Sequence, residues 1–312
     1  QVRVSRPDGL YYDADEILGG LIRSEVPPIG QASQRLVKLG VTGINDMTPT
    51  NDGVAWDWFL GLQNSGDLLQ RVRMSGRAEL SAQSSLPGLA CGEVKVHLHD
   101  TVLPELESFV ELIRTSHSSG RGVAVHCVTE VELVFTLAAF RAAGTLKGDR
   151  IEHASVMPFE LVEQVVELGL GVVTQPNFVF ERGDAYLRDV PELQHDSLYR
   201  VRSLIDQGIA TAFGTDLPFG NPDPWAAMRA ATERRTLSGE WLGEHEAVSP
   251  ERALSGFLRS LENPFVQRTV TVGAESDLRW LEAPWQAVRL DLAAHHLRMI
   301  VCRGKLIDVK ER

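Results

Sequence analysis

The sequence predicts an α/β fold of the (β/α)8 TIM-type barrel class, followed by a small β appendage at the C-terminus. Short β-branched segments alternate with helical patterns from residue 41 onward, and several of the apolar segments end in polar residues. The length of 312 residues suits one barrel of about 250 residues with a small addition. We therefore assign residues 1–262 to the barrel and 263–312 to the C-terminal part of a small β-sandwich.

Seven strands can be counted in the barrel part of the chain. They are Val41–Asn45, Leu69–Met74, Glu93–Leu98, Gly122–His126, Arg150–Glu152, Leu170–Thr174 and Ile209–Phe213. A barrel of this class closes with eight strands. We therefore expect the first strand to be missing from this chain, with residues lost before Gln1.

Helices are predicted between the strands by their start signals and by apolar residues at helical spacing. Pro104-Glu105 begins a helix that runs to Gly120. Asp223-Pro224 and Ser249-Pro250 each combine an N-cap residue with a proline at the first helical position. These helices are expected to cover the outer side of the sheet.

Four segments depart from this alternation. Residues 75–92 are predicted to form a loop, and Gln175–Ser197 a long irregular segment, which is the candidate for a lid over the site. The extended segments Thr269–Leu281 and Met299–Val309, with glycines at their turns, form the predicted β appendage.

Composition excludes several classes of protein. Hydrophobic residues make up 43% and charged residues 23%, with a mean hydropathy of -0.09, which is typical of a folded globular chain. The net charge of -11 argues against a nucleic-acid or anionic-membrane surface. The longest apolar stretch, Val131–Ala143, is too short to cross a bilayer.

Three dispersed cysteines, Cys91, Cys127 and Cys302, build neither a disulfide framework nor a zinc knuckle. A reducing compartment fits this usage, so a cytoplasmic location is expected. Cys127 is predicted to be a small buried hydrophobe. The expected partner is a small-molecule substrate, and homo-oligomerisation is left open.

Polar residues follow three of the predicted strands. His126 ends one strand, His153 directly follows the next, and Asp216 comes after the last strand and the small residue Gly214. Because barrel enzymes carry their chemistry at the C-terminal ends of strands, these side chains are expected to share one mouth. Each of them alone also occurs as a structural residue, and Asp216 could cap a turn. Together they are the nitrogen and oxygen donors of an open zinc site.

Lys95 lies on a strand whose two faces differ. Alternation places Lys95, His97 and His99 on one face and the apolar Val94, Val96 and Leu98 on the other, so the polar face is expected to point into the barrel. Burying an unpaired ammonium is costly, which makes Lys95 either a chemical residue or an ion-pair partner. Glu152, in contrast, is expected to face the surrounding helices as an ion-pair partner.

Six short segments occur in the order and spacing of a known family. They are Val94-Lys95, Ala124-Val125-His126, Arg150-Ile151-Glu152-His153-Ala154, Thr174-Gln175-Pro176-Asn177, Phe213-Gly214-Thr215-Asp216 and, in the tail, Val272-Gly273-Ala274-Glu275-Ser276-Asp277-Leu278. With these segments the chain, from about residue 35 to its end, resembles the amidohydrolase superfamily, and most of all the YtcJ-like branch of amidohydrolase family 3. The resemblance implies a barrel that holds one or two divalent metals, zinc foremost.

The resemblance also implies a role for each candidate residue. Lys95 would be the fourth-strand lysine, which is often carboxylated and then bridges two metals. His126 and His153 would be metal ligands, and Asp216 both a ligand and a proton shuttle. The family's His-x-His belongs to the first strand, so we interpret His97-Leu98-His99 as part of the fourth strand instead.

The function predicted on these grounds is a metal-dependent hydrolase that cleaves a non-peptide C–N bond in an amide, formamide or cyclic amide, using metal-activated water. Substrate contacts are expected from Asn177 and Arg182 in the candidate lid, although that segment could be a plain surface loop, and from His97. Arg182 would clamp an anionic group. Two alternatives stay open: a truncated or degenerate inactive barrel, and a Schiff-base lyase that uses Lys95.

Overall fold

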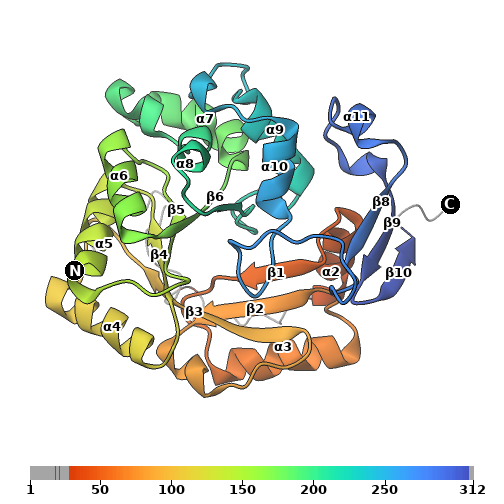
Figure 1. The fold of residues 1–312 in the computed structure, drawn as a ribbon, viewed down its shortest axis with the longest axis horizontal. Helices are drawn as coiled ribbons and strands as arrows, with labels where there is room; N and C mark the ends of the chain where they lie inside the picture. Colours follow the sequence, from red (N-terminus) through yellow and green to blue (C-terminus); the bar gives the residue numbers. More distant parts are fainter. Residues whose placement is uncertain (1–17, 19–20, 22–27, 309–312) are drawn as a thin grey trace.

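The computed structural model describes residues 18, 21 and 28–308 of the chain. Within them, seven strands form a parallel sheet in the order β1 to β7, and three more form an antiparallel sheet in the order β10-β9-β8. Figure 1 shows the larger sheet curled around a centre with helices on its outer side, and the smaller sheet at one side of the molecule. The predicted α/β barrel class and the C-terminal β appendage are confirmed.

The seven parallel strands agree in number and place with the predicted ones. They are β1 (Gly43–Asp46), β2 (Arg71–Gly76), β3 (Leu89–His97), β4 (Val123–Cys127), β5 (Arg150–His153), β6 (Gly171–Thr174) and β7 (Thr211–Phe213). Every neighbouring pair is parallel, so all seven carboxyl ends meet at one mouth. β1 and β7 are the edges of this sheet within the described residues, and the first strand expected before Gln1 is not among them.

Helices precede, connect and follow these strands. They are α2 (Ile29–Lys38), α3 (Gly53–Ser65), α4 (Leu106–Ser118), α5 (Glu130–Ala143), α6 (Phe159–Leu168), α7 (Asn177–Asp189), α8 (Arg202–Asp206), α9 (Pro224–Glu233), α10 (Pro250–Phe257) and α11 (Trp285–Val288), with the short 3-10 helices η1 (Ala78–Ala82), η2 (Glu192–Ser197), η3 (Glu244–Glu246) and η4 (Ala294–His296). The predicted caps are present, because Asp223 accepts from the Trp225 amide at 2.9 Å and Ser249 from the Arg252 amide at 3.3 Å. No helix of the described chain is long and apolar enough to span a membrane.

Two segments predicted to be irregular are more ordered than expected. Gln175–Ser197 forms α7 and η2, so the prediction of an irregular lid was wrong. Gly183 interrupts the helical pattern because α7 packs closely there: a Cβ atom at this position would lie 2.5 Å from the Thr236 Cγ2. The predicted loop at residues 75–92 contains η1 and the start of β3 at Leu89.

Strand alternation builds the main core between the sheet and helices α4 to α6. In β4, Val123, Val125 and Cys127 are buried in this outer core, whereas His126 lines the cavity inside the barrel. Burial raises the pKa of Cys127 to about 12, so the prediction that this residue is an inert buried hydrophobe agrees with its environment.

The antiparallel sheet packs on the barrel through a second core. Its strands are β8 (Leu278–Leu281), β9 (Leu297–Cys302) and β10 (Lys305–Asp308). Leu297 and Ile300 belong to one buried cluster with Phe213 of β7 and Trp225 of α9. The domain boundary between residues 262 and 263 therefore stays a prediction, because residues before and after it pack in one apolar cluster.

Candidate metal centre

Four imidazole rings form a row at the carboxyl ends of β3, β4 and β5. The centroid distances are 4.5 Å between His99 and His97, 4.1 Å between His97 and His126, and 4.4 Å between His126 and His153. His97, His126 and His153 line a cavity of about 2100 Å³. Two of the predicted ligands thus lie side by side at the expected mouth of the barrel.

His153 reaches this row through an unusual backbone conformation. In the sheet register it is the partner of Cys127, whose side chain points into the outer core. The φ angles of His153 and Ala154 are 72° and 50°, which is left-handed backbone that residues other than glycine rarely adopt. Such conformations cost about 1–3 kcal/mol each and cluster at functional sites. The turn brings the His153 ring inward, against His126.

Glu152 lines the cavity inside the barrel, so the expectation that it faces the helices was wrong. It shares the inner face of β5 with Arg150, whose Nε donates to the Glu152 Oε1 at 2.5 Å. Arg150 is 1% exposed and also pairs with Glu93 at 3.1 Å. A charged strand residue can point inward here because a partner of opposite charge stands two positions away on the same face.

Lys95 is inside the barrel as predicted, with 8% of its surface exposed. Within the described chain its ammonium has no ion pair within 4.0 Å. Burial lowers the pKa of Lys95, and the more distant charges of Glu152 and Asp216 only partly oppose this effect. Lys95 is therefore more easily neutral than an ordinary lysine, as a metal-linked or nucleophilic amine must be.

The tautomer of His153 is set by a residue to which the sequence assigned no role. The Gln175 Oε1 lies 2.7 Å from the His153 Nδ1, so Nδ1–H donates and the Nε2 lone pair is available to a cation. Burial and the Lys95 charge lower the pKa of His153, and burial together with His153 lowers the pKa of His126 to about 2. The neutral form, which binds metals, is thereby favoured in both rings. Gln175 could have been found, because it directly follows the end of β6.

Asp216 lies just beyond β7 and lines the same cavity. Its φ angle is 56°, and the turn is closed by its backbone carbonyl, which accepts from the Phe219 amide at 2.7 Å and the Gly220 amide at 3.0 Å. The carboxylate is thus not needed to cap the turn. Its charge raises the pKa of both Lys95 and His153, as a negative group near both of them must.

The three predicted substrate contacts differ in where they lie. His97 and Arg182 line the cavity. Asn177 is buried beside it, and its Nδ2 donates to the Thr215 carbonyl at 3.2 Å. Asn177 therefore positions the residue next to Asp216, and a direct contact of Asn177 with substrate stays a prediction.

A chain of hydroxyl groups on the cavity wall was not predicted. The Ser155 Oγ donates to the Tyr199 Oη at 3.0 Å, and the Tyr186 Oη lies 3.0 Å from the same oxygen. All three residues line the cavity. They come from three separate connections, and no local pattern marks them.

The donor types at the mouth fit a divalent cation such as zinc. Two neutral imidazoles, one carboxylate and a buried amine surround one cavity. In residues 28–308, however, Asp291, His295 and His296 make the one group of three His, Cys, Asp or Glu donors that lie within 4.8 Å of one another. The donor atoms of His126, His153 and Asp216 are thus farther apart, and side-chain rotation must accompany metal binding.

The family of this chain follows from its sequence match. A family model described as "Amidohydrolase family" matches residues 25–256. The chain belongs to the amidohydrolase family. The resemblance to family 3 and its YtcJ-like branch is thereby confirmed.

Two curated relatives match parts of this amidohydrolase. It is 25% identical over 216 residues to the N-substituted formamide deformylase of Arthrobacter pascens. This match covers 64% of the present chain and 40% of the relative. It is 27% identical over 143 residues to the putative amidohydrolase YtcJ of Bacillus subtilis (strain 168), covering 45% and 26%. The amidohydrolase chain thus spans less than half the length of either relative.

Solved structures share the fold of this amidohydrolase. An uncharacterised metal-dependent hydrolase from Pyrococcus furiosus superposes with a TM-score of 0.65 at 23% identity, over 79% of this chain and 58% of that one. A metal-dependent hydrolase from Pyrococcus horikoshii OT3 gives a TM-score of 0.67 at 22% identity, over 78% and 57%. Ochratoxinase from A. niger gives 0.57 at 14% identity, over 96% and 79%.

Proposed function

We propose that the protein containing this chain is a metal-dependent hydrolase that cleaves a non-peptide C–N bond in an amide, formamide or cyclic amide. The observation that carries the proposal is that Lys95, His126, His153 and Asp216 line one cavity at the carboxyl ends of the barrel strands. The family supports hydrolysis, and the name of the Arthrobacter pascens relative supports a C–N bond as the target.

The proposed metal is zinc, which this set of nitrogen and oxygen donors favours. His126 and His153 would hold it as neutral imidazoles, with Lys95 and Asp216 as further ligands. When bound, a divalent cation would polarise the substrate carbonyl and lower the pKa of a water molecule to about 7.

The proposed reaction adds water across the C–N bond. The Asp216 carboxylate takes a proton as the carbonyl carbon is attacked, and passes it to the nitrogen when the C–N bond breaks, so that an acid and an amine leave. Gln175 keeps the His153 ring in one tautomer during these steps. The ion pair of Arg150 and Glu152 lies on the inner face of β5, and its charges act on the nearby Lys95.

The test combines metal analysis with an amine-release assay on N-substituted formamides, N-acyl amines and cyclic amides. Activity of the zinc-loaded chain should disappear with a chelator and fall at least about 100-fold in Asp216→Asn. The matched control is Asp189→Asn, because Asp189 is an exposed carboxylate on the same cavity, and it should keep full activity. Activity that survives metal removal, or an unaffected Asp216→Asn enzyme, would refute the proposal.

The lowered pKa of Lys95 also favours a second candidate, a Schiff-base lyase. In that reaction the Lys95 amine condenses with a substrate carbonyl and releases water. Borohydride would then reduce the imine to a secondary amine, which adds the mass of the substrate less one oxygen atom to Lys95. A mass adduct on Lys95 that forms only with substrate and borohydride would support the lyase, and its absence under turnover would support the hydrolase.

A further inference from the structure

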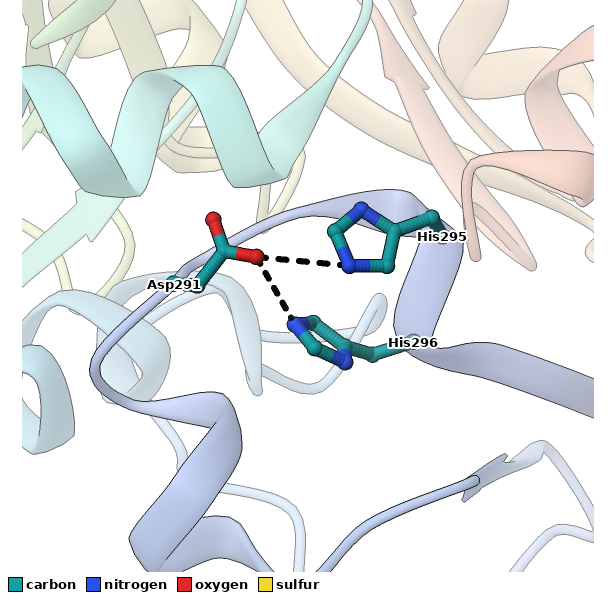
Figure 2. Close-up of side chains that lie close together, drawn as sticks. All are labelled: Asp291, His295 and His296. Carbon is teal, nitrogen blue, oxygen red and sulfur yellow. Dashed lines mark hydrogen bonds and ion pairs between the residues drawn. The ribbon is translucent and has the colours of Figure 1, made fainter.

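We propose that Asp291, His295 and His296 form a second site for a transition metal of the zinc class, on the C-terminal appendage. Figure 2 shows the Asp291 carboxylate pointing at both imidazole rings. The three donor atoms lie within 4.8 Å of one another. None of the three residues lines the barrel cavity, so this inference does not depend on the proposed function.

The spacing of the three side chains fits a set of metal ligands. The Asp291 Oδ2 lies 3.3 Å from the His295 Nε2 and 3.3 Å from the His296 Nε2. A charge-assisted N–H···O bond measures about 2.7–2.9 Å. Around a tetrahedral zinc with ligand distances of about 2.0–2.2 Å, neighbouring donor atoms lie about 3.3–3.6 Å apart. The observed distances therefore agree with the edge of such a tetrahedron.

Both imidazole rings face the Asp291 carboxylate. The contact between the His296 Nε2 and Asp291 meets the angular requirements of a hydrogen bond. The His295 Nε2 lies at the same distance from the same oxygen, and both rings are on one side of the carboxylate (Figure 2). Two imidazole nitrogens and one carboxylate oxygen thus lie close together, and a cation bound between them would replace these direct contacts.

The local chain holds these donors in place without a metal. Asp291 follows α11, and the two histidines end η4, directly before β9. Between them Leu292 is 3% exposed, and its carbonyl accepts from the Arg229 guanidinium of α9. The loop is anchored to the barrel at its middle, so binding would require little ordering of the chain.

The site is open to solvent on one side. The side chains of Asp291 and His295 are 60% and 64% exposed, and that of His296 is 17% exposed. A cation can enter from solution, and water can complete its coordination. Two imidazoles and one carboxylate select zinc, nickel or copper over magnesium and calcium, which prefer oxygen ligands.

Another exposed histidine supplies a matched control. His245 also faces two carboxylates, with its Nδ1 3.9 Å from Asp196 and its Nε2 3.8 Å from Glu246. Because the two carboxylates face different nitrogens of one ring, they cannot converge on one cation with it. His245→Gln should therefore leave metal binding unchanged.

The experiment is a zinc titration, by calorimetry, of the tag-free and metal-depleted full chain. The wild type should bind one zinc more than His295→Gln or His296→Gln, or bind that zinc at least about 10-fold more tightly. His245→Gln should match the wild type. In a His126→Gln/His153→Gln background, which removes the barrel donors, this zinc should remain, and it should vanish when His295→Gln is added.

Thermal unfolding gives a second readout. Because zinc at this site binds the folded state, it should raise the melting temperature of the wild type more than that of His296→Gln, and the two proteins should melt alike in chelator. Equal zinc stoichiometry and affinity in the wild type, His295→Gln and His296→Gln would overturn the proposal. So would an equal effect of magnesium, since this would reflect unspecific charge binding.

Discussion

The rings of His126 and His153 lie 4.4 Å apart, with their planes at 70°, although strand alternation alone would separate them. His126 is on the inner face of β4, and His153 pairs in register with Cys127 on the outer face. The left-handed backbone at His153 and Ala154 reverses the direction of the side chain. The ring is then held by Gln175, so the pairing of the two imidazoles depends on a turn and on one amide.

Gln175→Ala is expected to weaken zinc binding at the barrel mouth by about 10–100-fold and to leave the fold intact. The Gln175 amide oxygen selects the tautomer that exposes the His153 Nε2, and such supporting contacts have effects of this size. Zinc titration of the variant in a His295→Gln background would measure the affinity of the site at the barrel mouth without a contribution from the site on the appendage.

The control for this variant is Gln194→Ala. Gln194 lies on the same cavity wall, but its amide contacts Glu130 at 3.2 Å instead of a histidine. Its removal should not change the affinity. Equal binding by the Gln175→Ala and Gln194→Ala proteins would show that the amide has no part in ordering the ligand.

Lys95→Met should make the metal-free protein more stable and at the same time abolish metal-dependent activity. Burial lowers the pKa of Lys95 below its ordinary value of 10.5, so the folded state resists the charged form that the unfolded chain prefers. Below pH 10.5 this costs the wild type stability that a methionine would not lose. The gain should be about 1–3 kcal/mol at pH 7 and should shrink as the pH rises toward 10.5.

Unfolding of Lys95→Met in chelator at pH 7 and pH 10, with Lys147→Met as an exposed control, measures this difference. The control should alter neither stability nor activity. A strong loss of stability in Lys95→Met would mean that the ammonium holds the barrel together, which would argue against a chemical role.

Glu93→Gln should destabilise the protein by about 3–5 kcal/mol at pH 7, because it leaves the buried Arg150 and Arg73 short of a negative partner. Burial opposes ionisation of Glu93, but Arg150 and Arg73 outweigh it and hold its pKa at about 2, below the ordinary 4.5. The stabilisation by the ionised form is therefore complete above pH 4.5 and is lost as the pH falls toward 2.

The difference between the wild type and Glu93→Gln should accordingly narrow between pH 4.5 and pH 2, as urea unfolding at several pH values would show. Glu275→Gln serves as the control, since Glu275 pairs with Arg71 at 3.0 Å but is half exposed. Its loss should cost less than about 1 kcal/mol. If the difference in stability between the wild type and Glu93→Gln does not change with pH, Glu93 is not the ionised partner of the two arginines.

The strands and the residues at their ends could be predicted because both follow from local patterns. Lys95 and His126 are on the inner faces that period-two alternation gives them, and parallel strands bring their carboxyl ends to one mouth. Alternation failed in β5. There the turn at His153 adds an inward residue beyond the regular pattern, while Glu152 is kept inside by the neutralising Arg150.

The remaining errors concern features that local sequence patterns do not specify. α7 was missed because its glycine, Gly183, reflects close packing against Thr236 and not a break in the chain. The grouping of Asp291, His295 and His296 was not predicted, since spacings of four and five residues on a loop specify no common direction. Only the folded loop shows that the three donors meet.

Helix α7 leads to a last prediction, about charge selection by Arg182. One of its Nη atoms donates to the Phe219 carbonyl at 2.8 Å, and its guanidinium stacks over the Phe178 ring at 4.3 Å. The group is thereby held at the cavity with other N–H donors left for a ligand. Arg182→Ala should lower kcat/KM for anionic substrates about 10-fold or more, through KM, and leave neutral substrates unchanged.

The matched variant is Arg188→Ala, on the last turn of the same helix, where the side chain is 70% exposed and paired with Asp189. Arg188→Ala should leave kcat/KM unchanged for both anionic and neutral substrates. Arg182→Lys should recover part of the loss, since it restores the charge without the planar fork. If Arg182→Ala lowers kcat/KM equally for anionic and neutral substrates, the side chain acts by holding Phe219 and the turn after Asp216 in place, and charge selection must lie elsewhere.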